Sequence, residues 1–209
     1  MNKEQILITW HGHSCFTVTA DGYSIVLDPY APESVPGLAE LNLTADQLLW
    51  SHEHRDHYYP EAVRLSGSSK KNPFNILKID TFHDDQKGKL RGANRIHILE
   101  AGGLRIAHMG DLGCMLKPDQ AEQLKRLDAV LIPVGGYYTI TAAQAKEVTK
   151  LLSPRVVVPM HYRSDTFGYP VIGRLEEYTG LCNDVVAYDT NMITINKDTR
   201  PQTAILKLV

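Results

Sequence analysis

The chain has few cysteines, no long apolar run and no excess of charge of one sign. Its three cysteines, Cys15, Cys114 and Cys182, are too scattered for a disulfide framework, so we expect free thiols and a reducing compartment. The charged segment 1–6 has no signal-peptide core, and no stretch reaches the roughly 18 apolar residues of a membrane span. We therefore expect a cytoplasmic protein that does not cross a membrane.

The charges are nearly balanced, with 22 Lys and Arg against 24 Asp and Glu and a formal net charge of -2. Such a chain lacks the electropositive surface that binds nucleic acid or an acidic membrane, so a small-molecule substrate is favoured. With 209 residues and 43% hydrophobic content, residues 1–209 can bury a sizeable core as a single domain. The sequence leaves the oligomeric state open, and a homo-oligomer is one of the alternatives.

The most informative segment is Ser51–His57, where three histidines and an aspartate follow a short apolar run. Imidazole nitrogens and carboxylate oxygens are ligand types that Zn²⁺ prefers. In an extended or turn segment, residues two apart point to the same side, so we expect His52, His54 and Asp56 to converge and His57 to face another way. One turn could then serve two metal ions. The metalloprotease pattern H-E-x-x-H is not formed here, which argues against that class.

Hydrophobic periodicity and turn residues predict mostly strands in the first half, at 5–10, 15–20, 23–27, 46–50, 75–82, 95–100 and 104–108. A short helix is expected over 60–65. The second half alternates strands with helices that start near 118, 142 and 174, with strands at 129–133, 156–158, 185–188, 192–195 and 203–208. This pattern predicts an α/β fold, a four-layer αββα sandwich of two mixed β-sheets flanked by helices.

Candidate ligands also stand at the ends of three later strands, at His83, Asp111 and His161. The pattern H-x-H-x-D-H of residues 52–57, followed along the chain by these three residues, resembles the ordered motifs of the metallo-β-lactamase superfamily. The segments that carry the closer resemblance, to the Zn-dependent hydrolase branch containing the L-ascorbate-6-phosphate lactonase, are 10–16, 25–29, 82–85, 91–94, 108–113 and 159–162. The ordered motifs cover residues 28–161, and they are specific to the superfamily rather than to one activity.

The resemblance implies a metal centre with one or two Zn²⁺ ions. By position, the first ion would be bound by His52, His54 and His83, the second by Asp56, His57 and His161, with Asp111 bridging the two. Mn²⁺ or Fe²⁺ are alternatives, because these ligand types do not select one metal. Iron-dependent members of the superfamily carry a glutamate where His54 stands, which favours zinc here.

The resemblance also implies the reaction. A metal-bound hydroxide would hydrolyse an ester, lactone or phosphoester of a small anionic metabolite, with Asp56 as the catalytic residue that orients the nucleophile or moves a proton. Two alternatives stay open. One is a metal-binding ligand sensor without turnover, and the other is a phosphodiesterase or nuclease of the same superfamily.

Several residues beside the motifs complete the predicted site. Asp28 resembles the family's aspartate that orients a ligand imidazole, and a plain Asp-Pro turn is the alternative. His13 and His108 are expected to contact the ligands or line the pocket, or else to be satisfied core histidines. His97 is expected on the polar face of its strand, with no role for it or for His11. Substrate contacts are expected from Arg91, Tyr137, Tyr138 and Arg163.

Overall fold

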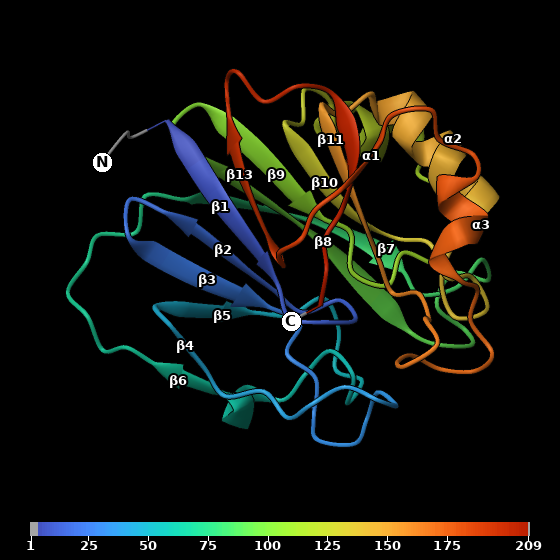
Figure 1. Cartoon of the computed structure of the whole chain (residues 1–209), viewed down its shortest axis with the longest axis horizontal. Coiled ribbons are helices and arrows are strands. Elements are labelled where there is room, and N and C mark those ends of the chain that lie inside the picture. Colours follow the sequence, from blue (N-terminus) through green and yellow to red (C-terminus); the bar gives the residue numbers. More distant parts are fainter. Residues whose placement is uncertain (1–3, 209) are drawn as a thin grey trace.

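A computed structural model describes residues 4–208; residues 1–3, part of the N-terminal segment considered above, and residue 209 lie outside the described residues. The first sheet has five strands in the order β13-β1-β2-β3-β5. Its strands are β1 (Gln5–Trp10), β2 (Phe16–Ala20), β3 (Tyr23–Leu27), β5 (Gln47–Leu49) and β13 (Met192–Asn196). In Figure 1 this sheet lies on the side opposite the helices.

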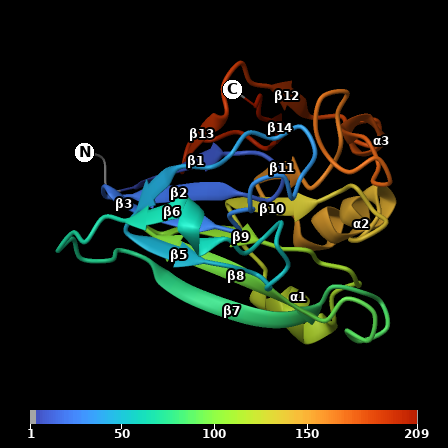
Figure 2. The same cartoon turned by 90° about the horizontal axis from the view of Figure 1, so that it is seen from below.

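The second sheet has seven strands in the order β12-β14-β11-β10-β9-β8-β7. They are β7 (Asn75–Phe82), β8 (Ala93–Ala101), β9 (Leu104–His108), β10 (Ala129–Pro133), β11 (Val156–Met160), β12 (Val185–Ala187) and β14 (Gln202–Ile205). Figure 2 shows β7 and β12 at its opposite edges. A small third sheet pairs β4 (Leu43–Ala45) with β6 (Val63–Leu65).

The pairing directions bring many strand ends to one side of the molecule. In the first sheet, β1 and β3 are both antiparallel to β2, and β5 runs parallel to β3. In the second sheet, β9, β10 and β11 are parallel, and β7 runs in the same direction because both β7 and β9 are antiparallel to β8. The strands β1, β3 and β5 of the first sheet, and β7, β9, β10 and β11 of the second, therefore deliver the residues that follow them to a shared rim of their sheet.

The main core lies between the sheets and beneath the helices. Ile8 and Phe16 of the first sheet belong to the same buried cluster as Ile98 and Leu131 of the second. Burial of such side chains is the dominant favourable contribution to folding. A smaller cluster covers the other face of the first sheet, where Val26 packs with residues of the segment 30–63.

Three α-helices lie on the right of Figure 1, beside the seven-stranded sheet: α1 (Pro118–Gln123), α2 (Ala142–Leu152) and α3 (Leu175–Thr179). Helix α2 starts where the sequence predicts. Thr141 caps it by accepting a hydrogen bond from the Gln144 backbone N–H at 3.3 Å, while the Gln144 side chain accepts one from the Thr141 N–H at 2.9 Å. The predicted α/β fold with two mixed sheets and flanking helices is confirmed.

The helix predicted over 60–65 is wrong. Only a 3₁₀ turn, Pro60–Ala62, forms, and Val63–Leu65 continues as β6, which pairs with β4. The proline fits the first position of either kind of helix, but the β-branched Val63 extends and finds a strand partner 20 positions earlier in the chain. The outer face of the first sheet is thus covered by a loop and this small sheet.

Candidate metal centre

The predicted ligands follow the strands of both sheets. The turn after β5 carries His52, His54, Asp56 and His57, whereas His83, Asp111 and His161 follow β7, β9 and β11 of the second sheet. His161 has a φ of +53°, and Asp28 and His13 at other strand ends have φ of +48° and +49°. These left-handed conformations are uncommon outside glycine, and they turn the chain sharply at the site.

His52, His54 and His83 form the first group of side chains. One ring nitrogen from each lies within 4.8 Å of the others. His52 and His83 are buried, whereas His54 is exposed to solvent. This group, called the first subsite here, is the set that the family resemblance assigns to one ion, and it is open on the side of His54.

Asp56, His57 and His161 form the second group, and the structure adds His13 to it. The expectation from residue spacing, that Asp56 would side with His52 and His54, is wrong. The segment is a tight turn rather than extended, with the His57 backbone N–H donating to the His54 carbonyl at 2.9 Å. This turn directs Asp56 to the side of His57, so the group, called the second subsite here, agrees with the assignment by resemblance.

Asp111 lies between the two subsites. Its Oδ2 is 3.2 Å from His83 Nε2 and 3.3 Å from His161 Nε2, and its Oδ1 is 3.1 Å from His57 Nε2. Two donors held at 2.0 to 2.1 Å in a tetrahedral zinc site lie about 3.3 Å apart. The separations therefore fit ligands that share metal ions. Because Oδ2 is close to an imidazole of each subsite and Oδ1 is close to the second subsite, this carboxylate could bridge two ions.

Unpaired buried atoms support the fit to divalent metal. His52 Nε2, His57 Nε2, His161 Nε2 and Asp111 Oδ1 are buried without a hydrogen-bond partner. Leaving such an atom unpaired costs about 1 to 3 kcal/mol, and buried polar atoms in proteins nearly always have a partner. Here they face one another across a few ångströms, which is the arrangement expected of metal ligands.

Asp28 orients two of the imidazoles. Its Oδ2 accepts hydrogen bonds from His57 Nδ1 at 2.8 Å and from the Ser51 hydroxyl at 2.6 Å, and its Oδ1 accepts from the Ser51 backbone N–H at 2.6 Å. The Ser51 hydroxyl in turn lies 2.9 Å from His52 Nδ1 and can accept its proton. With both Nδ1 atoms protonated, the Nε2 lone pairs of His52 and His57 are free for a metal.

Asp111 is held by its own set of contacts. Its backbone N–H donates to Asn94 Oδ1 at 2.8 Å, and Asn94 is fully buried. Gly110 has a φ of +55°, and a Cβ there would come within 2.4 Å of Asn94 Oδ1 and Ser51 Cβ, so only glycine fits. His108 accepts from the Gly110 N–H at 3.1 Å and lies 2.9 Å from the Ser14 carbonyl, so it has a structural role beside the ligands.

The electrostatics of the cluster favour a positive charge at its centre. Burial raises the pKa of Asp111, but His161 and His57 outweigh it and hold this pKa well below its ordinary value. Burial lowers the pKa of His57, but Asp111 and Asp56 outweigh that effect and raise it well above normal. Burial lowers the pKa of His52 to about 3, which keeps this imidazole neutral and able to bind a metal.

The four residues predicted to contact the substrate lie in two places, with Arg91, Tyr137 and Tyr138 together and Arg163 apart from them. A groove beside the first subsite is lined by Trp50, His54 and Arg91, and the Arg91 guanidinium lies 5.5 Å from the centre of the Tyr138 ring. Tyr137 packs edge-on against Tyr138 and is largely exposed. Arg163 instead donates from Nε to the Ile172 carbonyl at 2.8 Å and lines a different groove.

Three residues that support the site could not be recognised from the sequence, because each contacts a site residue that is distant in the chain. Ser51 and Asn94 are described above. The Tyr169 hydroxyl lies 2.6 Å from the Ser34 carbonyl oxygen and 3.2 Å from Asp56 Oδ2, and the Tyr169 ring packs against that of His13. Burial first, and Asp56 second, raise the pKa of Tyr169, so its hydroxyl stays a donor. No pattern in the sequence joins Tyr169 to Asp56.

His97 is buried, at 1% exposure, so its predicted place on a polar face is wrong. The reason is that β8 is an interior strand on which Ile96, His97, Ile98 and Leu99 are all buried in succession. His97 faces His108 in the β8–β9 ladder, and its Nδ1 has no hydrogen-bond partner. It is outside the three groups of potential metal ligands among the described residues.

Replacing His97 by leucine should stabilise the metal-free protein, and more at pH 5 than at pH 7.5. Burial lowers the pKa of His97 from 6.5 to about 4. Between these values the unfolded chain binds a proton that the folded protein does not, so stability falls as the pH drops from 6.5 towards 4, by about 2 kcal/mol at pH 5. Urea unfolding of both proteins at the two pH values measures the difference. An equal gain in stability at pH 5 and pH 7.5 would show that the effect does not come from the lowered pKa of His97.

The two sheets and the cluster of histidines and aspartates at their rim define a metal-binding protein of the metallo-β-lactamase fold. The chain belongs to the family described as the beta-lactamase superfamily domain, whose profile matches residues 7–161. Among curated proteins it is 28% identical over 179 residues to a UPF0173 protein of Pyrococcus furiosus, covering 74% of this chain and 82% of that one. A UPF0173 metal-dependent hydrolase of Ignicoccus hospitalis is 29% identical, with coverage of 76% and 83%.

Solved structures agree. A Thermotoga maritima protein, described provisionally as a zinc-dependent hydrolase of the metallo-β-lactamase superfamily, is 29% identical with a TM-score of 0.74, over 96% of this chain and 98% of that one. A metallo hydrolase of Ignicoccus hospitalis has a TM-score of 0.65 at 22% identity, over 92% and 99%, which supports the fold alone. The predicted superfamily is therefore confirmed, while the branch that contains the lactonase stays a prediction.

Proposed function

We propose that this protein is a zinc-dependent hydrolase that cleaves an ester, lactone or phosphoester bond of a small anionic metabolite. The observation that carries the proposal is the convergence of seven predicted ligands from two sheets, with unpaired buried donors facing a common centre. The first subsite would bind one ion, the second subsite another, and Asp111 both. When bound, such ions supply a water molecule of lowered pKa and a Lewis acid for the bond under attack.

Asp56 would orient the attacking water or move a proton. Burial raises the pKa of Asp56, but His57 and His13 outweigh it, so the carboxyl is ionised and accepts hydrogen bonds. Its Oδ2 is 3.3 Å from His13 Nε2 and 3.8 Å from His57 Nε2, at the edge of the cluster. The Tyr169 hydroxyl lies 3.2 Å from the same oxygen and can donate a hydrogen bond to it.

The groove beside the first subsite supports an anionic substrate. Arg91 and Arg95 line it together with His54, and the Tyr138 ring holds the Arg91 side chain by a cation–π contact. A guanidinium binds a carboxylate or phosphate through paired hydrogen bonds. A sugar-phosphate lactone is the first substrate to test, because the sequence resembles the branch that contains such a lactonase.

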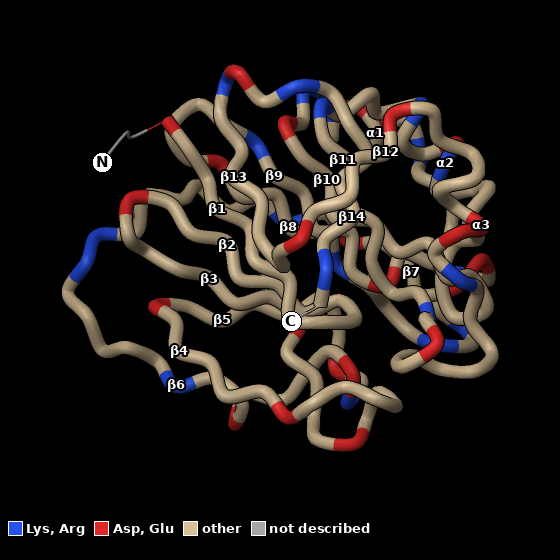
Figure 3. The backbone as a smooth tube through the Cα atoms, viewed as in Figure 1, with Lys and Arg blue, Asp and Glu red and all other residues tan. Residues whose placement is uncertain are grey.

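The surface charge supports a small molecule rather than nucleic acid as the partner. Figure 3 shows Lys and Arg interspersed with Asp and Glu along the chain rather than gathered on one face.

No helix among the described residues is long and apolar enough to span a bilayer. We propose a cytoplasmic enzyme, since Cys15, Cys114 and Cys182 are free thiols, as expected of a reducing compartment.

Metal analysis and a substrate panel test the proposal together. Protein purified without chelator should contain about two zinc ions per chain and should hydrolyse at least one lactone, phosphodiester or thioester, and chelation should abolish this activity. Metal-loaded protein that is inert to the whole panel but binds an anionic metabolite would favour the ligand sensor instead. Protein that binds no divalent metal would exclude both.

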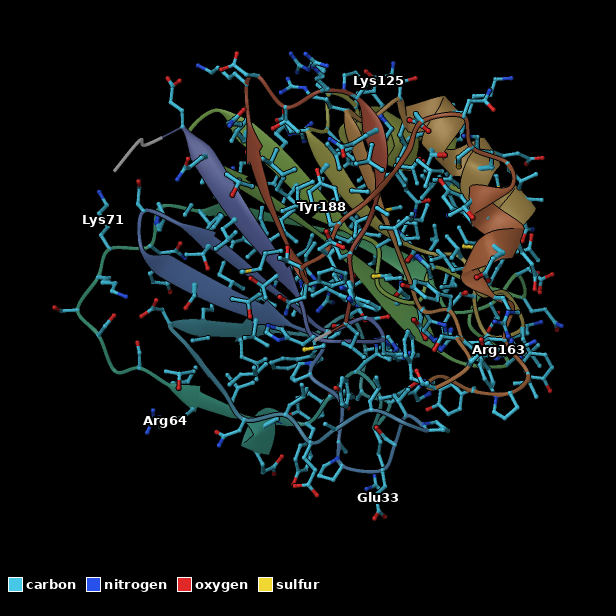
Figure 4. All side chains as sticks on the ribbon, viewed as in Figure 1. Glu33, Arg64, Lys71, Lys125, Arg163 and Tyr188 are labelled. Carbon is cyan, nitrogen blue, oxygen red and sulfur yellow. The ribbon has the colours of Figure 1, made fainter. Side chains whose placement is uncertain are left out.

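The Arg91→Ala variant should raise KM for an anionic substrate by about 10- to 100-fold while kcat changes little, because a hydrogen bond to a charged group contributes about 1.5 to 3 kcal/mol. The KM of the variant for a neutral analogue of the substrate should change little. Arg64→Ala is the control, since Arg64 lies on β6 at the lower left of Figure 4, is exposed and donates a hydrogen bond to Thr44. Equal losses for the anionic and neutral substrates would show that Arg91 does not bind the charge.

A further inference from the structure

His13 occupies an unusual place in the fold. It follows β1 with a φ of +49°, and its carbonyl accepts hydrogen bonds from the Trp10 indole at 3.0 Å and from the His161 backbone N–H at 3.4 Å. These contacts fix the end of β1 to the end of β11, although β1 and β11 belong to different sheets. The imidazole is 1% exposed and is directed into the second subsite.

The His13 ring has no hydrogen-bond partner at either nitrogen. Its Nε2 lies 3.3 Å from Asp56 Oδ2, and its ring centre is 4.1 Å from that of His161. The separation from Asp56 equals the one between His161 and Asp111, and it matches the distance of about 3.3 Å between two ligands of a tetrahedral zinc ion. An imidazole with an unpaired, buried nitrogen 3.3 Å from Asp56 Oδ2, and with its ligand atom within 4.8 Å of those of His57 and His161, is suited to binding metal.

Two neighbouring histidines differ from His13 in this respect. The His11 ring, two residues earlier, lies 2.7 Å from the Thr17 hydroxyl. The His108 ring is paired at both nitrogens, with the Ser14 carbonyl and the Gly110 N–H. Both therefore have the contacts of ordinary structural histidines, and His13 alone of the three has its nitrogens free and within the cluster.

We propose that His13 is itself a metal ligand, which binds through Nε2 in the second subsite beside Asp56, His57 and His161. This inference rests on the proposed metal centre. The second subsite then has four donors of its own besides Asp111, whereas the first subsite has three histidines, one of them exposed. Metal sites whose ligands are all protein groups hold their ion tightly, and sites with an open position bind water or substrate. The second ion should therefore be the tighter one, and the first should face the substrate groove.

The test replaces His13 by asparagine and measures metal affinity. Asparagine tolerates the left-handed backbone and can donate a hydrogen bond to Asp56, but it is a poor zinc ligand. Metal-free protein is titrated with Zn²⁺ against a chromophoric chelator. We expect two ions for the unsubstituted protein, and for the variant a loss of about 100-fold or more in affinity for the tighter ion, with the weaker one little changed.

His11→Asn is the matched control, two residues away in the same turn, and should retain both affinities. Thermal melting of the metal-free proteins checks that the variants fold, and His13→Ala repeats the test without a hydrogen-bond donor. In the Co²⁺-substituted protein, NMR should lose one strongly shifted imidazole N–H signal in either His13 variant and none in His11→Asn.

The outcomes separate this inference from the proposed function. Two ions in the unsubstituted protein, with His13→Asn affinities within about threefold of it, would overturn the ligand role and make His13 a hydrogen-bond donor to Asp56, while the proposed function stands. No metal binding by the unsubstituted protein would remove the proposed function itself. Loss of the tighter ion only in the His13 variants supports the inference.

Discussion

Replacing Asp111 by asparagine should remove tight binding of both metal ions and, with it, hydrolysis. Among residues 4–208, only Asp111 has carboxylate oxygens within 3.3 Å of imidazoles in both subsites. Loss of a group that merely orients a metal ligand costs about 10- to 100-fold in affinity, so loss of a shared charged ligand should exceed 100-fold for each ion. Asparagine keeps the size of the side chain, and the Asn94 contact to the backbone N–H is preserved.

Metal content after dialysis and turnover at saturating zinc measure this effect. Asp21→Asn is the control, because Asp21 is exposed in the turn between β2 and β3, at the end of the first sheet opposite the cluster. We expect the control to keep two ions and full turnover. An Asp111→Asn protein that still held two ions tightly would remove Asp111 from the centre and contradict the bridging role.

Asp28→Asn should be nearly as damaging at the second subsite, although Asp28 would touch no metal. The carboxylate accepts the His57 Nδ1 proton and so leaves Nε2 free. An asparagine amide at this position would donate to His57 Nδ1 instead and move the ring proton to Nε2, where it blocks metal binding. We expect about 100-fold weaker binding of one ion, with the fold retained because asparagine tolerates the left-handed backbone.

Competitive zinc titration checks this prediction. The control is Asp46→Asn, because Asp46 also accepts hydrogen bonds from serine hydroxyls, those of Ser66 and Ser68, but precedes β5 and is remote from the cluster. Burial raises the pKa of Asp28, but His108 and His57 lower it to about 2, so the wild-type carboxylate is ionised throughout the neutral range. Unchanged affinity for both ions in Asp28→Asn would show that the ring proton is fixed by other means.

Elements with strong local patterns could be predicted from the sequence. The apolar, strand-forming residues of 5–10 and 23–27, with the Asp21-Gly22 turn between strands, predict β1 and β3 with their observed bounds, and Thr141 marks the start of α2. The candidate ligands were found because three of them, with an aspartate, fall within six residues. The 3₁₀ turn at Pro60 and the strand β6 could not be predicted, because β6 depends on pairing with a segment far away in the chain.

The supporting contacts of the site were also beyond the sequence. Ser51, Asn94 and Tyr169 act on Asp28, Asp111 and Asp56 across 17 to 113 positions, and such pairs leave no local periodicity. Spacing likewise placed Asp56 on the wrong side of its turn. The backbone hydrogen bond within the turn, rather than an extended conformation, decides the direction of that side chain.

The ligands come from both halves of the fold: the first sheet delivers the donors between His52 and His57, and the second delivers His83, Asp111 and His161. Bound ions would therefore act as crosslinks between the two sheets. The free energy of metal binding becomes part of the cohesion of the whole domain, and depletion of metal weakens the architecture as well as the chemistry. A cell that withholds the metal would, through this one arrangement, change both the activity and the lifetime of the protein.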